Sequence, residues 1–309
     1  MITSSAPGKI ILFGEHAVVY GQPALAVPVT QVHADVRIEE IFGPGVWINA
    51  PNIQLHSRLD ALASSHPLAA TVNNALSALG VSYLSDISIL IRSTIPVASG
   101  LGSGAAVSVA LIRALAHYVG KPLTDEQVSA LAFETEKLYH GTPSGIDNTV
   151  VTFARPVYFV KGQPPQTFQV GRPFTIVIGD TGIAASTKET VGDVRRLWQE
   201  NPGRFETYFD AIGSIVRTAR QVIEAGFPDN LGPLMEENHA LLRQMSVSSP
   251  QLERLVAAAR AAGALGAKLS GGGRGGNMIA LVRPEIAEAV IGSLKEAGAK
   301  QVIHTQVGA

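Results

Sequence analysis

The chain has 309 residues, of which 46% are hydrophobic and 16% charged, and its formal net charge is −1. The length allows one large core or, more often, two domains, and the composition is typical of a soluble globular protein. The net charge does not favour binding to nucleic acid or to an anionic membrane surface. The absence of cysteine excludes disulfides, thiolate zinc sites and cysteine nucleophiles, and no apolar run or leader pattern indicates a membrane span or a signal peptide. We therefore expect a cytoplasmic enzyme or binding protein.

The N-terminal segment places polar residues around a short apolar strand. Lys9 stands at the head of the strand predicted for residues 10–13, and Glu15 and His16 follow Gly14 at its far end. Such side chains are costly to bury without partners. One interpretation is the exposed end of a surface strand, and the other is a functional cluster.

The next elements are two strands and a helix. Residues 32–41 alternate apolar and polar side chains, which predicts a half-exposed antiparallel strand. Residues 46–50 are predicted to be its hairpin partner, with a Gly-Pro-Gly turn between them. Proline near the start and glycine at the end predict a helix over residues 67–79.

A glycine-rich segment joins a strand to a helix in the middle of the first half. The strand predicted from Ile87 breaks at Pro96, and an apolar helix is predicted over residues 102–119. Between them, glycines at 100, 102 and 104 leave the backbone amides uncovered, next to the positive end of the helix dipole. This pattern indicates an anion site, most often for phosphate, although close packing of a helix on a sheet gives the same pattern.

Two common nucleotide-binding patterns do not account for this segment. Gly100, Gly102 and Ala105 fit the dinucleotide fingerprint, but a second helix follows where that fingerprint requires a strand ending in an acidic residue. The P-loop pattern occurs nowhere in the chain. Any ATP site therefore uses a different loop.

The remaining elements complete a two-lobed α+β architecture. Thr124 and Gln127 form a capping box that opens a helix ending at Tyr139, and a polar loop follows at residues 140–148. Residues 162–173 are the candidate linker between domains at 1–170 and 171–309. The other predicted elements are strands at 149–153, 156–160, 175–180, 278–282 and 301–305, and helices from Ser186 to Glu200, at 204–225, at 231–245, from Pro250 and at 284–297; a second glycine-rich loop covers residues 268–277.

Three polar residues suit phosphoryl transfer, which needs a phosphate cradle, a magnesium ligand, a cation and a group that deprotonates the acceptor. Glu136 lies on an otherwise apolar helix face, and Asp147 lies in a Pro/Gly-containing loop where a base could be held. Lys9 beside Asp147 would keep that carboxylate ionised. Alternatively, Glu136 is an exposed helix residue and Asp147 an N-cap or turn residue.

Three motifs in order across the chain resemble the GHMP kinase superfamily. They are Ala-Pro-Gly-Lys at 6–9, Pro-x-x-x-Gly-Leu-Gly-Ser at 96–103 and the late loop at 270–277. Within that superfamily the chain is most similar to the mevalonate kinases, on the segments 14–24, 140–148, Thr181-Gly182 and Ser186-Thr187-Lys188.

The resemblance implies a kinase that uses ATP and Mg²⁺ to phosphorylate the primary hydroxyl of mevalonate, feeding isoprenoid synthesis. It implies an N-terminal lobe like the second domain of ribosomal protein S5 and a ferredoxin-like C-terminal lobe. Homodimers are common among such proteins. The residues expected to bind the ATP phosphates are Pro96, Ser99, Gly100, Leu101, Gly102, Ser103, Gly104, Ala105 and Ala106.

The resemblance also implies roles for the polar residues. Asp147 is the expected base, and Lys9 is expected to stabilise the transferring phosphoryl group and the alkoxide. Glu136 and Ser103 are the expected magnesium ligands. The expected acceptor-binding residues are Lys9, Glu15, His16, Asp147, Thr187 and Gly272.

Two departures from the family pattern and two alternatives accompany this prediction. Gly104 stands where the family has a magnesium-binding serine, so we expect weakened metal binding. Arg274 replaces a usual glycine and is expected either to point to solvent or to add positive charge near the phosphates or an acidic substrate. One alternative is a related kinase acting on a sugar or on phosphomevalonate, for which Arg274 or Lys188 would supply positive charge. The other is a catalytically silent, ligand-binding relative.

Overall fold

The computed structural model describes residues 1–84, 86–96, 99–140 and 143–308, without the side chains of residues 139 and 140. These residues form two compact units. The first comprises Met1–Gly8, Val32–Val97 and Leu101–Ala154, and the second comprises Lys9–Gln31, Ala98–Gly100 and Arg155–Ala309. The units alternate along the chain because strands β1 (Ile2–Phe13) and β2 (Ala24–Glu40) each contribute residues to both. The division into family domains at residue 170 stays a prediction.

The strands of the first unit have a different order from the predicted hairpin. Strand β5 (Ile87–Ser93) lies between β2 and β3 (Val46–Ala50), antiparallel to β2 and parallel to β3. Strand β4 (Leu55–Arg58) is the antiparallel partner of β3. The prediction that residues 46–50 pair with residues 32–41 is therefore wrong, because β5 returns to occupy that position. The alternating burial predicted for residues 32–41 is confirmed.

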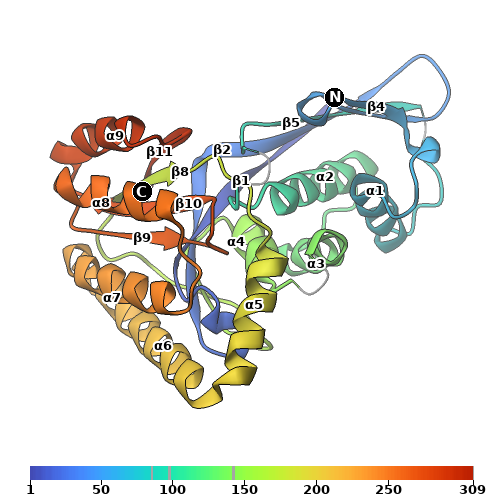
Figure 1. The fold of residues 1–309 in the computed structure, drawn as a ribbon. Helices are drawn as coiled ribbons and strands as arrows, with labels where there is room; N and C mark the ends of the chain where they lie inside the picture. Colours follow the sequence, from blue (N-terminus) through green and yellow to red (C-terminus); the bar gives the residue numbers. More distant parts are fainter. Residues whose placement is uncertain (85, 97–98, 141–142, 309) are drawn as a thin grey trace. The chain divides into compact units, whose positions relative to one another are not determined.

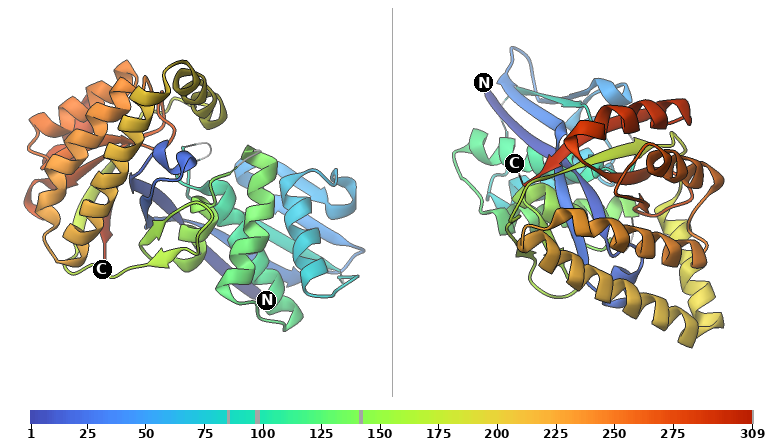
Figure 2. Two further views of the ribbon diagram at one scale, coloured as in Figure 1. Left: turned by 90° about the horizontal axis from the view of Figure 1, so that it is seen from below. Right: turned by 90° about the vertical axis from the view of Figure 1, so that its left-hand side faces the viewer.

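Four helices of the first unit pack on one another beside these strands (Figures 1 and 2). They are α1 (Pro67–Ala78), α2 (Ser103–Val119), α3 (Asp125–His140) and α4 (Ile146–Phe153). Helix α2 is buried over most of its surface, as its apolar sequence predicted. The capping box of α3 is also confirmed, since Thr124 N donates to Gln127 Oε1 at 2.9 Å and Gln127 N donates to Thr124 Oγ1 at 3.3 Å.

Helix α4 replaces the strand predicted for residues 149–153. Gly145, with φ 92°, precedes the helix as its N-cap, and Thr149 Oγ1 donates to the Gly145 carbonyl at 2.7 Å. The β-branched residues Val150 and Val151, which suggested a strand, are buried in a helix that packs against α2 and α3. Tertiary burial here overrides a weak local preference.

The sheet of the second unit is antiparallel, in the order β11-β8-β10-β9. Its strands are β8 (Phe174–Asp180), β9 (Gly266–Ser270), β10 (Asn277–Val282) and β11 (Gln301–Val307), which confirms three predicted strands and adds β9. Helix α8 (Pro250–Ala261) packs on β9 and β10, and α9 (Ala287–Glu296) packs on β8 and β11 (Figure 1). This is the expected α+β arrangement of the C-terminal half.

The other helices of this unit form a separate layer. Helix α6 (Pro202–Glu224) packs against α5 (Thr187–Glu200) and α7 (Leu231–Gln244) (Figure 1). Ser186 and Ser249 cap α5 and α8, as predicted. The shorter elements of the chain are β6 (Val157–Phe159), β7 (Gln166–Thr167) and the 3₁₀ turns Ala17–Tyr20, Pro51–Ile53, Leu59–Ala61, Pro228–Asn230 and Pro284–Ile286. Within the described residues, no helix has the length and apolar character needed to cross a bilayer.

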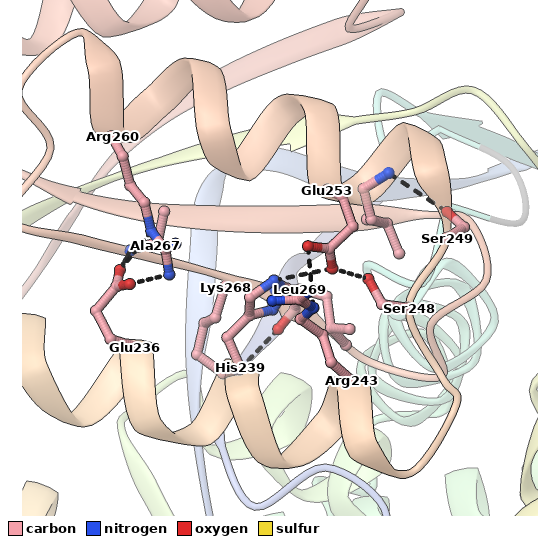
Figure 3. Close-up of polar contacts among 11 residues, drawn as sticks. Glu236, His239, Arg243, Ser248, Ser249, Glu253, Arg260, Ala267, Lys268 and Leu269 are labelled. Carbon is pink, nitrogen blue, oxygen red and sulfur yellow. Dashed lines mark hydrogen bonds and ion pairs between the residues drawn. The ribbon is translucent and has the colours of Figure 1, made fainter.

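Strand β9 lies at the edge of its sheet, and side chains of α7 contact it there (Figure 3). Ala267 N donates to Glu236 Oε1 at 3.0 Å, and Leu269 N donates to His239 Nδ1 at 3.3 Å. Glu236 also pairs with Arg260 of α8. Two backbone amides of the edge strand are thereby paired with side chains instead of a neighbouring strand.

Candidate functional site

The late glycine loop, residues 271–276 between β9 and β10, is fixed at several points of the second unit. Gly276 N donates to the Ile183 carbonyl at 3.0 Å, and Arg274 N donates to the Val247 carbonyl at 2.8 Å. Gly273 has φ +79°, and a Cβ placed on it would lie 1.9 Å from Val247 O. The loop therefore needs glycine at this position both for its backbone conformation and for its close approach to residue 247.

Three of the predicted acceptor-binding residues meet at this loop. His16 Nε2 donates to the Gly272 carbonyl at 3.0 Å. A Cβ on Gly272 would lie 2.9 Å from Thr187 Oγ1, so the loop backbone lies directly against the first residue of α5. The structure thus brings together residues from positions 16, 187 and 272.

Burial sets the protonation state of His16. Its pKa is lowered to about 4, chiefly by burial, with the positive charge of Arg274 acting in the same direction and the hydrogen bond to Gly272 opposing it. The imidazole is therefore neutral at neutral pH. Because the Gly272 carbonyl can only accept, the ring proton is on Nε2 and Nδ1 carries a lone pair.

Glu15 forms a buried ion pair that the sequence analysis did not anticipate. Its Oε1 accepts a hydrogen bond from Lys268 Nζ, both side chains are 0% exposed, and Lys268 also donates to the Leu269 carbonyl at 2.7 Å. Burial raises the pKa of Glu15 and lowers that of Lys268, while the attraction between them opposes both shifts. Because Lys9, Glu15 and His16 are all buried, the interpretation as an exposed strand end is wrong.

The late glycine loop also adjoins the other two motif regions within the second unit. Asn277 Nδ2, at the end of the loop, donates to the Ser99 carbonyl at 2.5 Å. Ser270 Oγ, at its start, donates to the carbonyl of Ile11 in β1 at 2.7 Å. The late glycine loop is therefore flanked by contacts to residues about 260 positions earlier, in β1, and about 180 positions earlier, in the first glycine segment.

The first glycine segment has the backbone geometry that its sequence predicts. Gly100 and Gly102 have φ values of 80° and 75°, and Gly102 is the N-cap of α2. Since glycine has no side chain, the first-turn amides of α2 receive no side-chain cap. Ser103 and Gly104 lie in this turn and are half-buried. Phosphate binding by residues 99–106 stays a prediction.

The three residues expected to carry the chemistry lie in different elements. Glu136 is buried in α3, so its interpretation as an exposed helix residue is wrong. Asp147 is half-buried in the first turn of α4, after the N-cap Gly145, rather than in a loop or at the N-cap. Lys9 is buried in β1. Because Lys9 belongs to the second unit and the two acidic residues to the first, the approach of Lys9 to Asp147 stays a prediction.

Arg274 does not point freely into solvent, as one sequence interpretation had it. Its Nη1 donates to Asp193 Oδ2 of α5 at 2.5 Å, and its Nε donates to the Ser246 carbonyl at 3.4 Å. The hydrogen bond from Arg274 lowers the pKa of Asp193, and the positive charges of Arg274 and Arg196 act in the same direction. The sequence carries no signal for this pair beyond the unusual residue in a glycine loop.

The chain thus has two sheets, a glycine segment that leads into the buried helix α2, and a second glycine loop whose end contacts Ser99 of that segment. This α+β fold carries glycine at the helix start in the manner typical of phosphate-binding proteins. Family models for the N-terminal and C-terminal domains of GHMP kinases match residues 67–155 and 219–300. The chain belongs to the GHMP kinase family, and the predicted fold class is confirmed.

Several relatives that are at least 30% identical over most of this chain are mevalonate kinases. The mevalonate kinase of Thermococcus sibiricus is 39% identical, with 98% of this chain and 95% of the relative covered, and that of Pyrococcus abyssi is 37% identical with the same coverage. The crystal structure of L. major mevalonate kinase in complex with R-mevalonate is similar with a TM-score of 0.87 and 32% identity, covering 99% of this chain and 95% of that one.

Proposed function

We propose that this protein transfers the γ-phosphoryl group of ATP to the primary hydroxyl of mevalonate, forming 5-phosphomevalonate for isoprenoid precursor synthesis. The names of the relatives support this acceptor. The structural observation that carries the proposal is the meeting of His16, Gly272 and Thr187 at the late glycine loop, which itself adjoins the start of the first glycine segment at Ser99.

The acceptor side of the proposed site is a set of neutral and paired groups. His16 is uncharged and presents a lone pair on Nδ1, so it suits a hydroxyl donor better than an anion. Thr187 supplies a hydroxyl at the start of α5. Glu15 keeps a carboxylate beside these groups because Lys268 compensates its charge.

The chemical step is assigned to Asp147 and Lys9. Asp147 accepts the proton of the primary hydroxyl as its oxygen bonds to the γ-phosphorus and the bond from that phosphorus to the bridging oxygen breaks, releasing ADP. Lys9 neutralises negative charge on the transferring group. The uncapped amides in the first turn of α2 bind phosphate oxygens at the positive end of the helix dipole.

The residues present fit a magnesium ion. Glu136 is a buried carboxylate on α3, Ser103 is a hydroxyl at the start of α2, and the two helices pack together. Oxygen donors in this small number suit Mg²⁺, which keeps water and phosphate oxygens as further ligands; the described residues hold no cluster of three or more His, Asp or Glu that would cage a metal. When bound, the ion offsets negative charge on the phosphates.

A coupled assay of ATP consumption tests the proposal, with mevalonate, phosphomevalonate and galactose as separate acceptors. We expect turnover with mevalonate and little with the other two. Preference for phosphomevalonate or galactose would replace the proposal with another acceptor in the same superfamily. ATP binding without turnover on any acceptor would identify a silent relative. Asp147→Asn serves as the inactive control for background ATP hydrolysis.

A further inference from the structure

We propose that Arg274 and Asp193 form a clasp that holds the late glycine loop against the first two turns of α5 and thereby positions the acceptor-binding residues Thr187 and His16. Arg274 acts as a positioning residue, since its guanidinium contacts α5 rather than a reacting atom. The inference deepens the proposed function and rests on it for the identity of the acceptor.

The first observation is the conformation of Arg274. Its φ is +61°, in the left-handed region, where a non-glycine residue costs about 1 kcal/mol or more. Glycine would occupy this position without that cost. The chain has an arginine here instead, and its side chain is not loose, since Nη1 contacts Asp193 and Nε contacts the Ser246 carbonyl.

The second observation is the weak anchoring of the start of α5. The helix buries Thr190 and Val194, whereas residues 186–189 are exposed. Farther along, Trp198 packs edge-on against Tyr20 with ring centroids 5.2 Å apart. The far half of α5 thus has aromatic anchoring, whereas the near half has the buried Thr190 and its contacts with the late glycine loop.

The clasp and the acceptor residues are linked through a short stretch of backbone. Gly272 accepts from His16 and lies against Thr187, and Arg274 follows two residues later and reaches Asp193, six residues after Thr187 on the same helix. Loop and helix are therefore joined at two points. Loss of the contact between Arg274 and Asp193 lets the first turn of α5 and the loop shift independently. This shift separates the groups that contact the acceptor.

The pairing with Asp193 also determines how much positive charge Arg274 presents to a ligand. Asp193 neutralises the guanidinium, so the positive charge that a phosphomevalonate-type acceptor would need is already matched within the protein. An arginine that bound the acceptor directly would compete with Asp193 for the same guanidinium. The two roles predict opposite effects of removing Asp193.

The test compares Arg274→Gln, Asp193→Asn and the double variant by steady-state kinetics with mevalonate and ATP. The clasp predicts that each single change raises the KM for mevalonate about fivefold, corresponding to roughly 1 kcal/mol, and that the double variant is no worse than either single. The KM for ATP is expected to stay within about twofold. Glu200→Gln is the control, because it removes a carboxylate paired with Arg196 at 2.8 Å on the same helix, away from the loop, while Arg196 keeps its other partner Asp193 at 3.9 Å and the Arg274–Asp193 contact stays intact.

Direct binding of the acceptor by Arg274 would give a different pattern: Asp193→Asn would leave the KM unchanged or lower it, and this result would overturn the clasp. Equal effects of Glu200→Gln and Asp193→Asn would also overturn it. An Arg274→Gly variant as active as the unmodified protein would show that the ion pair positions nothing.

A second measurement separates this inference from the proposed function. Amide hydrogen exchange at Glu189 and Thr190, whose amides bond to Ser186, reports the first turn of α5 without any acceptor. The clasp predicts faster exchange there in Arg274→Gln and Asp193→Asn and not in Glu200→Gln. If the protein does not phosphorylate mevalonate but exchange changes in this way, the clasp stands and the acceptor is wrong. Unchanged exchange refutes the clasp whatever the acceptor.

Discussion

Replacement of Lys268 by methionine tests the ion pair between Glu15 and Lys268, which is the most completely buried charge pair described in the second unit. Methionine keeps most of the aliphatic length of lysine, so the packing volume changes little. The substitution leaves the Glu15 carboxylate 0% exposed and without its cation. It also removes the hydrogen bond that Lys268 donates to the Leu269 carbonyl.

The expected loss is large because the remaining charge stays buried. Removal of one partner of a buried ion pair costs about 3–5 kcal/mol of unfolding free energy, even where the intact pair contributes little net stability. A typical domain has roughly 5–15 kcal/mol in total, so Lys268→Met removes a large fraction of it. Burial already raises the pKa of Glu15, and loss of Lys268 raises it further, so the variant is expected to recover stability as the pH falls and Glu15 becomes protonated.

Urea unfolding, followed by circular dichroism at several pH values, measures the effect. Lys268→Met combined with Glu15→Gln is expected to recover much of the loss, because no buried charge remains without a partner. Lys295→Met, at an exposed position on α9, is the matched control and is expected to change stability by less than about 0.5 kcal/mol. A loss below about 1 kcal/mol in Lys268→Met, or a double variant as unstable as the single, would refute the reasoning.

Four further outcomes are expected. Asp147→Asn should nearly abolish turnover while leaving ATP affinity in a titration largely intact; equal activity would remove Asp147 from the mechanism. His16 has a folded pKa of about 4 against 6.5 in the unfolded chain, so the unfolded state binds more protons in this window and stability falls by about 3 kcal/mol as the pH drops from 6.5 to 4. His16→Gln should flatten that dependence in unfolding titrations, and an unchanged slope would contradict it. Gly273→Ala should lower the melting temperature, since its Cβ would meet the Val247 carbonyl at 1.9 Å, and an unchanged temperature would show that the loop relaxes freely. Gly104→Ser should lower the Mg²⁺ concentration for half-maximal rate, because it restores an oxygen ligand, and a higher requirement would argue against metal binding there.

Much of the fold could be predicted because its elements carry strong local signals. The serine caps of α5 and α8 and the apolar helix α2 were identified from residue order alone. The failures occur where distant packing decides the outcome. Helix α4 has a strand-like composition, and β5 separates β2 from β3, a long-range pairing that no short segment encodes.

The candidate site was predicted unevenly for a related reason. His16, Thr187 and Gly272 were identified through motifs, and the structure brings them together. Lys268 opens the predicted second glycine-rich loop but carried no predicted role, and Asp193 lies outside the motifs, although each compensates a charge that was singled out. Sequence motifs mark the groups that face a ligand, whereas the partners that hold those groups can come from any part of the chain.

The side chains on α7 that contact β9 have a consequence for how copies of this protein meet. An uncovered edge strand is a template on which another polypeptide can add a strand and begin an aggregate. Here Glu236 and His239 accept hydrogen bonds from the amides of Ala267 and Leu269, so side chains of α7 take the place of a neighbouring strand (Figure 3). Helix α7, which covers the strand leading into the late glycine loop, therefore also opposes the addition of strands from other copies at this edge of the sheet.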